Sequence, residues 1–482
     1  MSEPGSQAVG ELPRALTLRD LVLFNLVAVI GVRWLATAAY AGPSSLTLWI
    51  LAALLFFVPQ GLAVADLAAR YPDEGGIYRW TQRAFGEGHG FLCGWCYWIN
   101  NVLYYPSLLL SSAAIATYAF GAGDSGLADR WEYIAPVTLG GMWLAVGLNV
   151  VGLRWGRWLQ NVGGIGTYGP GAILVLLGVW AALTRPSANP IGAAALVPDV
   201  SDPSRVNLWA SIAFAYAGLE LSATLSGEVK DPRRTVPRSI LIAAPLIALL
   251  YLAGTGAILW LVPHGELNIV TGMLQAISAA TRELIPALAW IVPLAAAANA
   301  IGNLGGVGAW LSGSARVAFV VGVDRYFPPA FGRIHPRWGT PYLAILAQAG
   351  LSTVFLLASV LGKGTGVEEA YLILLDTMLL VYFIPYIYLF VCYLKAGRQA
   401  EGRAGSAGWR PGRRRTWLIG LSGLFVTVFA MGVAMIPPPG TTRAWLFELK
   451  VVGGAIAFVA AGGLLYWRAR REGARATLRE AA

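Results

Sequence analysis

The sequence predicts an all-α integral membrane protein, and three observations support this fold class. The first is composition, since 57% of the 482 residues are hydrophobic and 12% are charged. A soluble domain carries about 25% charged residues. The second is a series of apolar runs of roughly 20 residues, the length that a helix needs to cross the hydrocarbon core. The third is an uneven distribution of Lys and Arg among the segments between these runs.

The apolar runs give the number and position of the expected membrane helices. Twelve runs are long enough to span a bilayer. Their predicted bounds are 21–42, 46–66, 89–120, 134–153, 159–182, 207–226, 239–262, 287–322, 341–361, 369–394, 416–436 and 445–467. Because the count is even, both ends of the chain are expected on the same side of the membrane.

Lys and Arg predict the orientation, because these residues are retained on the cytoplasmic face. With the N-terminus inside, the inner segments include basic clusters around Arg413 and Arg470. The outer segments then hold only Arg130, Arg185, Arg205, Arg282, Lys363, Arg443 and Lys450. We therefore expect a multi-pass protein of the cell membrane with cytoplasmic N- and C-termini. The same bias and attraction to lipid headgroups explain the net charge of +10, so no nucleic-acid partner is expected.

Glu220 is a carboxylate within a stretch, residues 208–226, that is otherwise apolar. A charge at membrane depth costs about 2.5 to 3.5 kcal/mol on insertion scales, so such a residue usually faces a cavity, a partner or an ion path. Its position predicts that the chain moves something across a membrane.

Two of the predicted helices are interrupted by a glycine together with a charge. The first interruption is Val29 to Arg33 and the second is Phe214 to Glu220. A single glycine in a membrane helix more often permits close helix packing. The coincidence of glycine and charge in both helices favours unwound binding segments, which occupy corresponding positions if the first ten helices form two inverted repeats. Freed amides can bind a carboxylate and freed carbonyls an ammonium, which suits a zwitterion.

Enzyme chemistry and metal binding are not indicated by the reactive side chains. The cysteines and histidines are scattered among apolar runs and loop ends, at Cys93, Cys96, Cys392, His89, His264 and His335. Buried packing is the preferred interpretation of the cysteines. We therefore expect no catalytic residues, no metal site and no cofactor.

Several longer segments carry a family resemblance. They are Phe214-Ala215-Tyr216-Ala217-Gly218-Leu219-Glu220 with Gly227 to Arg238, Tyr71 to Trp80 with Ala84-Phe85-Gly86, and Trp310 to Arg316 with Asp324 to Phe331. These segments resemble the signatures of the amino acid–polyamine–organocation transporter superfamily, and the resemblance covers nearly the whole chain. Within it, the closest likeness is to glutamate:γ-aminobutyrate antiporters, through 58–66, 264–268, 272–275 and 310–316.

This resemblance implies a leucine-transporter-like fold with 12 transmembrane helices, a 5+5 inverted repeat and broken helices 1 and 6. It also implies an alternating-access cycle around a central amino acid site. The expected organisation is a cytoplasmic tail at 1–20, a ten-helix transport core at 21–394, helices 11 and 12 with a preceding basic loop at 395–467, and a cytoplasmic tail at 468–482.

The expected substrate-binding residues are those of the two interruptions: Ile30, Gly31, Val32, Arg33, Phe214, Ala215, Tyr216 and Gly218. Phe214 matches the family's gating aromatic on helix 6, with ordinary packing as the alternative. Tyr216 could offer its hydroxyl to substrate or to a freed carbonyl. For Trp310 on helix 8, gating and packing are equally supported.

Glu220, Asp376 and Trp310 are the expected coupling and gating residues. The family's usual helix 1 motif, Gly-Ser-Gly-Ile-Phe, here reads Gly31-Val32-Arg33-Trp34-Leu35, so that Arg33 replaces a glycine. Arg33 either pairs with Asp376 of helix 10, binds an acidic substrate, or extends to water. The helix 5 segment 161–171 contains no lysine, which leaves the coupling ion open between H⁺ and Na⁺.

The sequence therefore predicts a secondary active transporter of amino acids or related amines, working by proton symport or by exchange. Its partners are expected to be a small-molecule substrate and membrane lipid, and the sequence does not indicate an oligomeric state. A polyamine or organic-cation carrier is the alternative within the transporter class. A non-transporting membrane sensor of amino acids is the alternative outside it.

Overall fold

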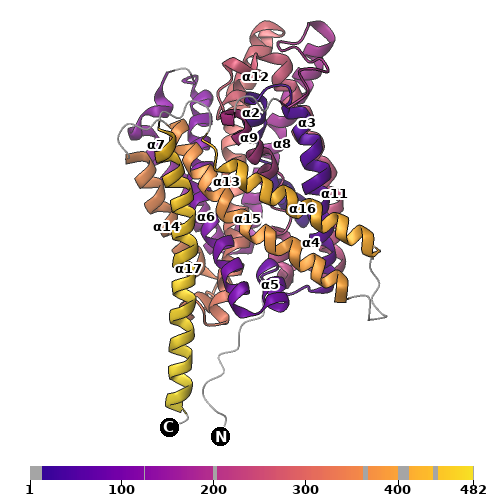
Figure 1. Ribbon diagram of the computed structural model, residues 1–482. Helices are drawn as coiled ribbons and strands as arrows, with labels where there is room; N and C mark the ends of the chain where they lie inside the picture. Colours follow the sequence, from indigo (N-terminus) through magenta and orange to yellow (C-terminus); the bar gives the residue numbers. More distant parts are fainter. Residues whose placement is uncertain are drawn as a thin grey trace.

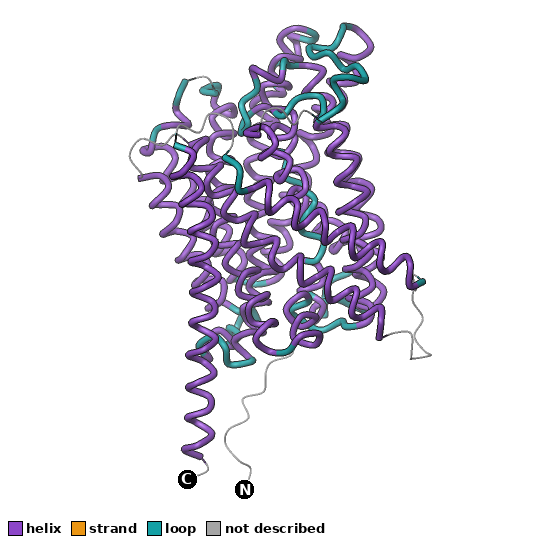
Figure 2. The backbone as a smooth tube through the Cα atoms, in the orientation of Figure 1, coloured by secondary structure: helices purple, strands orange, loops and turns teal. Residues whose placement is uncertain are grey.

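The structure, a computed structural model, describes residues 14–123, 125–198, 203–361, 367–399, 412–437 and 443–480. These residues form helices joined by loops and turns, as Figure 2 shows. Within these ranges, the extended pairing is a single bridge between Leu16 and Val229. The predicted all-α class is therefore confirmed.

Eleven helical segments of the described residues are long and apolar enough to cross a membrane. They are Leu18–Tyr40, Ser45–Arg70, Glu87–Phe120, Trp131–Val150, Trp155–Thr184, Pro232–Leu261, Pro286–Val323, Tyr342–Val360, Asp376–Arg398, Arg413–Ala434 and Ala444–Glu472. The prediction of a multi-pass membrane protein is thereby confirmed, and the segments coincide with eleven of the twelve predicted runs.

The remaining predicted run, 207–226, is divided in the structure. Helix α9 (Pro203–Ala215) is followed by the non-helical residues 216–220 and by the short helix α10 (Leu221–Thr224). The first span is divided in the same way, into α1 (Leu18–Val29) and α2 (Arg33–Tyr40). Both divisions fall where the sequence combines glycine with a charge.

The other helices carry the following bounds: α3 (Ser45–Ala52), α4 (Val58–Arg70), α5 (Ile77–Phe85), α6 (Glu87–Ala116), α7 (Trp131–Val150), α8 (Leu153–Thr184), α11 (Pro232–Leu261), α12 (Gly272–Glu283), α13 (Ile291–Val323), α14 (Tyr342–Leu361), α15 (Val367–Gln399), α16 (Arg413–Ala434) and α17 (Ala444–Glu480). A π-helical turn at Ala53–Phe57 joins α3 to α4. The short helices α5 and α12 were not predicted, because neither is long or apolar enough to resemble a membrane span.

Small residues allow α8 and α13 to pack closely. A Cβ atom added to Gly163 would lie 2.5 Å from the Cα atom of Gly305, and one added to Gly166 would lie 2.9 Å from the amide nitrogen of Gly302. Glycine pairs of this kind permit tight helix contact inside a membrane. This pairing fixes α13, the helix that carries Trp310 and Arg316.

The described ends of the chain lie at the same end of the bundle. Helix α17 extends beyond its neighbours past α5, as Figure 1 shows. Its Tyr466 packs against Phe91 and Tyr326, with ring centroids 5.5 and 5.3 Å away. At this same end, the segment before α1 joins the turn after α10 through the amide of Leu16, which donates to the Glu228 carbonyl at 2.9 Å.

Candidate functional site

The first division leaves residues 30–32 outside the two helices, between the end of α1 and the start of α2. Gly31 lies close to an indole here, since a Cβ atom on it would be 2.8 Å from the Trp34 ring. Ile30, Gly31 and Val32 therefore form the interruption, whereas Arg33 is the first residue of α2. The predicted break in helix 1 is confirmed.

The second division depends on Gly218, whose φ of +127° is a conformation that side chains disfavour. A Cβ atom on Gly218 would also lie 3.2 Å from both the Trp310 ring and a methyl of Val29. The predicted interruption between Phe214 and Glu220 is confirmed with one adjustment. Phe214 and Ala215 still belong to α9, and the non-helical residues start at Tyr216.

One hydroxyl, that of Tyr251 on α11, contacts both divisions. It accepts a hydrogen bond from the Gly31 amide at 3.1 Å. It lies 2.6 Å from the Val29 carbonyl and 3.1 Å from the Ala215 carbonyl, and it can donate to either. Because a hydroxyl has one proton, it bonds one carbonyl at a time. Tyr251 thus satisfies freed backbone groups of both divided helices.

We expect Tyr251→Phe to weaken substrate binding and to lower thermal stability, because it leaves a buried amide and two carbonyls without this partner. An unsatisfied buried polar group costs about 1–3 kcal/mol. Tyr133→Phe is the matched control, since the Tyr133 hydroxyl bonds the Ala113 carbonyl at 2.9 Å away from both divisions. Uptake kinetics and melting temperature should be measured together. A substrate KM unchanged in Tyr251→Phe would contradict a role at the divisions.

Glu220 is fully buried at the start of α10, at 0% exposure. Its Oε1 atom accepts hydrogen bonds from the hydroxyls of Tyr97 on α6, at 3.1 Å, and of Tyr382 on α15. Both donors come from helices that are distant from Glu220 in the sequence. The carboxylate is therefore held at a junction of three helices.

The second oxygen of Glu220, Oε2, is bonded as fully as the first. It accepts from the Gln60 amide at 3.1 Å, from the Gly218 amide at 3.2 Å and from the Tyr386 hydroxyl. The Tyr386 hydroxyl in turn accepts from Gln60 at 2.9 Å and from Gly218 at 2.8 Å. Every donor in this set points toward the carboxylate, an arrangement that stabilises its ionised form. We call Gln60, Tyr97, Tyr382 and Tyr386 the Glu220 cage.

Aromatic rings cover the space beside the Glu220 cage. Phe214 meets Trp34 edge-on at 5.5 Å and Tyr382 at 5.4 Å, and it is 5% exposed. Trp310 lies 5.8 Å from Tyr382 and donates its indole N–H to the Ala28 carbonyl at 2.9 Å. Phe214 and Trp310 therefore close the region between the two divisions.

Tyr216 is placed on a different side of the divided segment. Its ring stacks on Phe57 at 4.4 Å and its hydroxyl is 3.5 Å from the Trp49 carbonyl. Tyr216 therefore contacts α3 and the π-helical turn that follows it. It does not belong to the group of aromatic rings around Phe214.

Arg33 and Asp376 are both buried, at 2% and 0% exposure. The Arg33 guanidinium lies over the Trp34 ring at 4.5 Å and the Tyr104 ring at 5.1 Å. The faces of these two aromatic rings attract the guanidinium and offset part of the cost of burying its charge.

Comparison with known proteins identifies the family. The amino acid permease family model matches residues 16–464. The chain belongs to the amino acid permease family. It is 32% identical to an uncharacterized transporter of Legionella pneumophila, over 92% of this chain and 95% of that protein. It is 28% identical to a serine/threonine exchanger of Bacillus subtilis, over 70% and 76%. It is 24% identical to a glutamate/gamma-aminobutyrate antiporter of Lactococcus lactis, over 82% and 78%.

Membership of this family confirms the predicted resemblance to amino acid–polyamine–organocation transporters. It also confirms that the permease is a transporter and not an enzyme.

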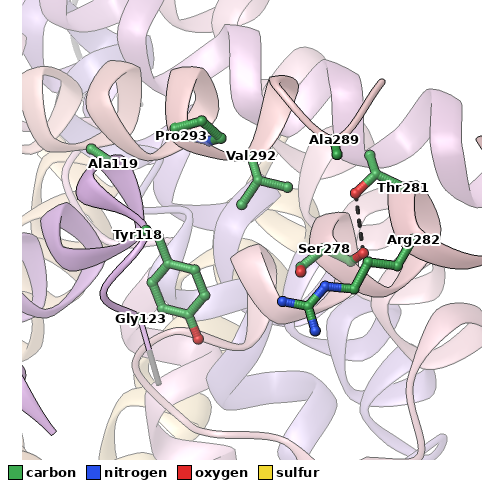
Figure 3. A pocket seen from close by; sticks show the side chains of 10 residues that line it. Tyr118, Ala119, Gly123, Ser278, Thr281, Arg282, Ala289, Val292 and Pro293 are labelled. Atoms are coloured by element: carbon green, nitrogen blue, oxygen red, sulfur yellow. Dashed lines mark hydrogen bonds between the residues drawn. The ribbon is translucent and has the colours of Figure 1, made fainter. Parts of the chain in front are cut away.

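A cavity of about 290 Å³ is lined by other residues, which Figure 3 shows. Its lining comes from the turns after α6, from α12, from the turn before α13 and from the start of α13: Tyr118, Ala119, Gly121, Gly123, Ser278, Thr281, Arg282, Ala289, Val292 and Pro293. The lining contains no residue predicted for the substrate site. The rings of Phe214 and Trp310 instead both pack against Tyr382.

Sequence reasoning missed the permease's Glu220 cage and Tyr251. One signal was available for Gln60, a polar side chain within the apolar run 46–66. Another was available for Tyr382 and Tyr386, whose spacing of four residues places them on one helix face. Neither signal identifies Glu220 as the partner, because that requires knowing which helices are neighbours.

Proposed function

We propose that this permease is a secondary active transporter of amino acids or related amines that works by alternating access, as a proton symporter or as an exchanger. The observation that carries the proposal is the meeting of two divided helices at a buried carboxylate. Paired discontinuities of this kind form the central site in transporters built from inverted repeats. The exchange activities named for the relatives from Bacillus subtilis and Lactococcus lactis support transport of amino acids.

The proposed topology counts α9 and α10 together as the sixth of twelve spans, with helices 1–5 and 6–10 as inverted repeats. Two observations support it. The divided segments are the first and sixth in order along the chain. The described chain ends also lie at one end of the bundle, as an even number of crossings requires. The Lys and Arg distribution supports a cytoplasmic location for that end.

The substrate is proposed to bind through backbone groups of the two divisions. The amides that open α2, at Val32 and Arg33, suit the α-carboxylate, because a helix N-terminus carries partial positive charge. Carbonyls at the ends of α1 and α9 suit the ammonium for the opposite reason. Phe214 would cover the bound substrate, since it already packs against Trp34 just beyond the first division.

Glu220 is proposed to carry the coupling proton. Its five hydrogen-bond donors favour the ionised form in the arrangement of this structure, and they oppose the cost of burying the charge. Separation of α4, α6 or α15 from α10 would remove some of these donors and make protonation easier. Proton binding would then be linked to the conformational change.

Arg33 and Asp376 are proposed to form an ion pair beside the site. Both residues lie near the same part of α6, and this supports the pair. Arg33 lies over Tyr104 of α6. One turn further along α6, Ser107 contacts Met378 at 3.9 Å. Met378 is two residues from Asp376 on α15. Buried opposite charges stabilise each other because an unpaired buried charge is costly.

A polyamine carrier is less well supported by the contacts. A diamine requires accessible carboxylate oxygens, and both oxygens of Glu220 are already engaged by protein donors. A membrane sensor that does not transport would have the same site. A measurement of substrate flux therefore distinguishes a sensor from a transporter.

The test is uptake by purified protein in proteoliposomes, with competition by neutral, acidic and basic amino acids and by diamines. Gradients of pH and of Na⁺ should be imposed separately. We expect competition by at least one class of α-amino acid, and accumulation driven by the pH gradient or by internal substrate. Binding without flux would overturn the transport proposal, and accumulation driven by Na⁺ alone would overturn the assignment of the proton.

A further inference from the structure

A second buried carboxylate contact lies at the end of the bundle that holds α5. The loop before α5 is bonded there to the chain that follows α10. The Gly75 amide donates to the Thr224 carbonyl at 3.2 Å, and the Gly227 amide donates to the Glu74 carboxylate at 2.6 Å. A side chain at residue 227 would displace this carboxylate, since its Cβ atom would lie 2.4 Å from Glu74 Oε2. Glu74 therefore links the loop to the chain after α10.

The neighbouring carboxylate, Glu228, is paired with Arg316 of α13. Arg316 donates from Nε to Glu228 Oε1 at 2.8 Å, and its Nη2 atom is 2.7 Å from the same oxygen. Its Nη1 atom donates to the Ser312 carbonyl at 2.7 Å. Arg316 and Glu228 are 3% and 1% exposed. The hydrogen bonds of the guanidinium are thus directed to Glu228 and Ser312, whereas Glu74 is bonded by a backbone amide.

The charges in this cluster do not cancel when both carboxylates are ionised, because two negative groups face one guanidinium. One oxygen of each, Glu74 Oε1 and Glu228 Oε2, is buried without a hydrogen-bond partner in the described part of the chain. Burial, and then the charge of Glu228, raise the pKa of Glu74 to about 8, against the lowering effects of Arg316 and the Gly227 amide. A single proton on Glu74 would remove the excess charge.

We propose that Glu74 binds one proton beside the ion pair of Glu228 and Arg316, at a site distinct from Glu220, and that this proton stabilises the contact between the loop and the chain after α10. A proton fits better than a metal cation, because the Arg316 guanidinium already lies 2.7 Å from Glu228 and would repel one. The other charged pair of the loop, Asp73 with Arg83 at 2.9 Å, is far more exposed. The segment before α1 reaches Glu228 through its backbone.

The direction of the pH effect follows from the two states of Glu74. In the open contact Glu74 is hydrated and has an ordinary pKa of 4.5, whereas in the closed contact its pKa is about 8. The closed contact therefore binds the proton more tightly and is most favoured below pH 4.5. The equilibrium constant for closing the contact falls by about tenfold for each pH unit between these two pKa values. Above the higher pKa value it falls no further.

The proton itself can be measured without any assumption about transport. Full-length protein in phosphatidylcholine vesicles should be titrated from about pH 6 to about pH 10 and followed by infrared difference spectroscopy. We expect a carboxylic acid band that is lost with a midpoint near pH 8. The band should be absent in Glu74→Gln and present in the matched control Asp73→Asn. A band that persists unchanged in Glu74→Gln would overturn the site.

Closure of the contact needs a second measurement, and this half of the inference rests on the proposed alternating-access cycle. Spin labels at the exposed positions Arg83 and Lys230 report the distance between α5 and the chain after α10. The population at short distance should fall as the pH rises, but should stay constant in Glu74→Gln. Glutamine keeps an oxygen for the Gly227 amide and is uncharged, as protonated Glu74 is, but it cannot release a proton. The same pH dependence in both proteins would overturn the role of the proton in closure, whatever the infrared result.

Discussion

Glu220→Gln should abolish ion-driven accumulation of substrate while retaining exchange of substrate across the membrane. Glutamine has the shape of glutamate but cannot bind and release a proton. Removing a positioned proton-transfer group costs about a hundredfold or more in rate. We therefore expect uptake driven by a pH gradient to fall by about that factor, and exchange to fall by less than about tenfold.

The contacts of Glu220 explain why glutamine can be accommodated. Its amide oxygen can replace Oε2 and accept from Gln60 and the Gly218 amide. Its amide nitrogen then takes the place of Oε1, where the hydroxyls of Tyr97 and Tyr382 can rotate to accept. The Gly218 amide can only donate a hydrogen bond. The glutamine at position 220 should therefore place its oxygen, and not its nitrogen, beside this amide.

Both activities of Glu220→Gln should be measured in proteoliposomes from one preparation, beside the surface control Glu283→Gln. Glu283 is a partly exposed carboxylate that pairs with Arg185. The control should retain both activities, because an exposed ion pair contributes little to stability. Equal and unimpaired rates of accumulation and exchange in Glu220→Gln would remove Glu220 from coupling.

The positions of both divided helices could be predicted because their causes are local. Gly218 has a positive φ and lies against Trp310, so glycine is required at the point where the helix stops. Gly31 approaches the Trp34 ring in the same way. A glycine beside a charge in an apolar run is visible in the sequence. The exact end of α9 was not visible, because Phe214 and Ala215 can continue a helix.

The partners of these residues could not be predicted, because they depend on which helices meet. Tyr251 is one aromatic residue in the long apolar helix α11, and nothing in its neighbouring residues distinguishes it from a packing side chain. Its hydroxyl becomes important only when α1 and α9 end beside it. Glu74 is a similar case, since its sequence context suggests an exposed loop charge and the structure places it against Gly227.

The last expected result concerns Arg33 and Asp376, and it separates a gate from a substrate ligand. If the two residues pair, Arg33→Ala leaves a buried carboxylate and Asp376→Ala leaves a buried guanidinium. Each single change should then reduce uptake strongly, because breaking a buried pair costs about 3–5 kcal/mol. The double variant removes both charges and should recover part of the loss. The aromatic contacts of Arg33 with Trp34 and Tyr104 limit this recovery, since they are lost in both Arg33 variants.

An acidic substrate bound by Arg33 gives a different pattern in the same double-mutant cycle. Asp376→Ala would then leave Arg33 freer to bind the substrate, and its affinity for glutamate should rise. The double variant would be as impaired as Arg33→Ala alone. Uptake and substrate affinity should both be measured, because pairing predicts a coupling energy in uptake whereas substrate binding predicts one in affinity for acidic amino acids. Strictly additive losses in both measurements would contradict the ion pair and leave Arg33 as an independent contributor to the site.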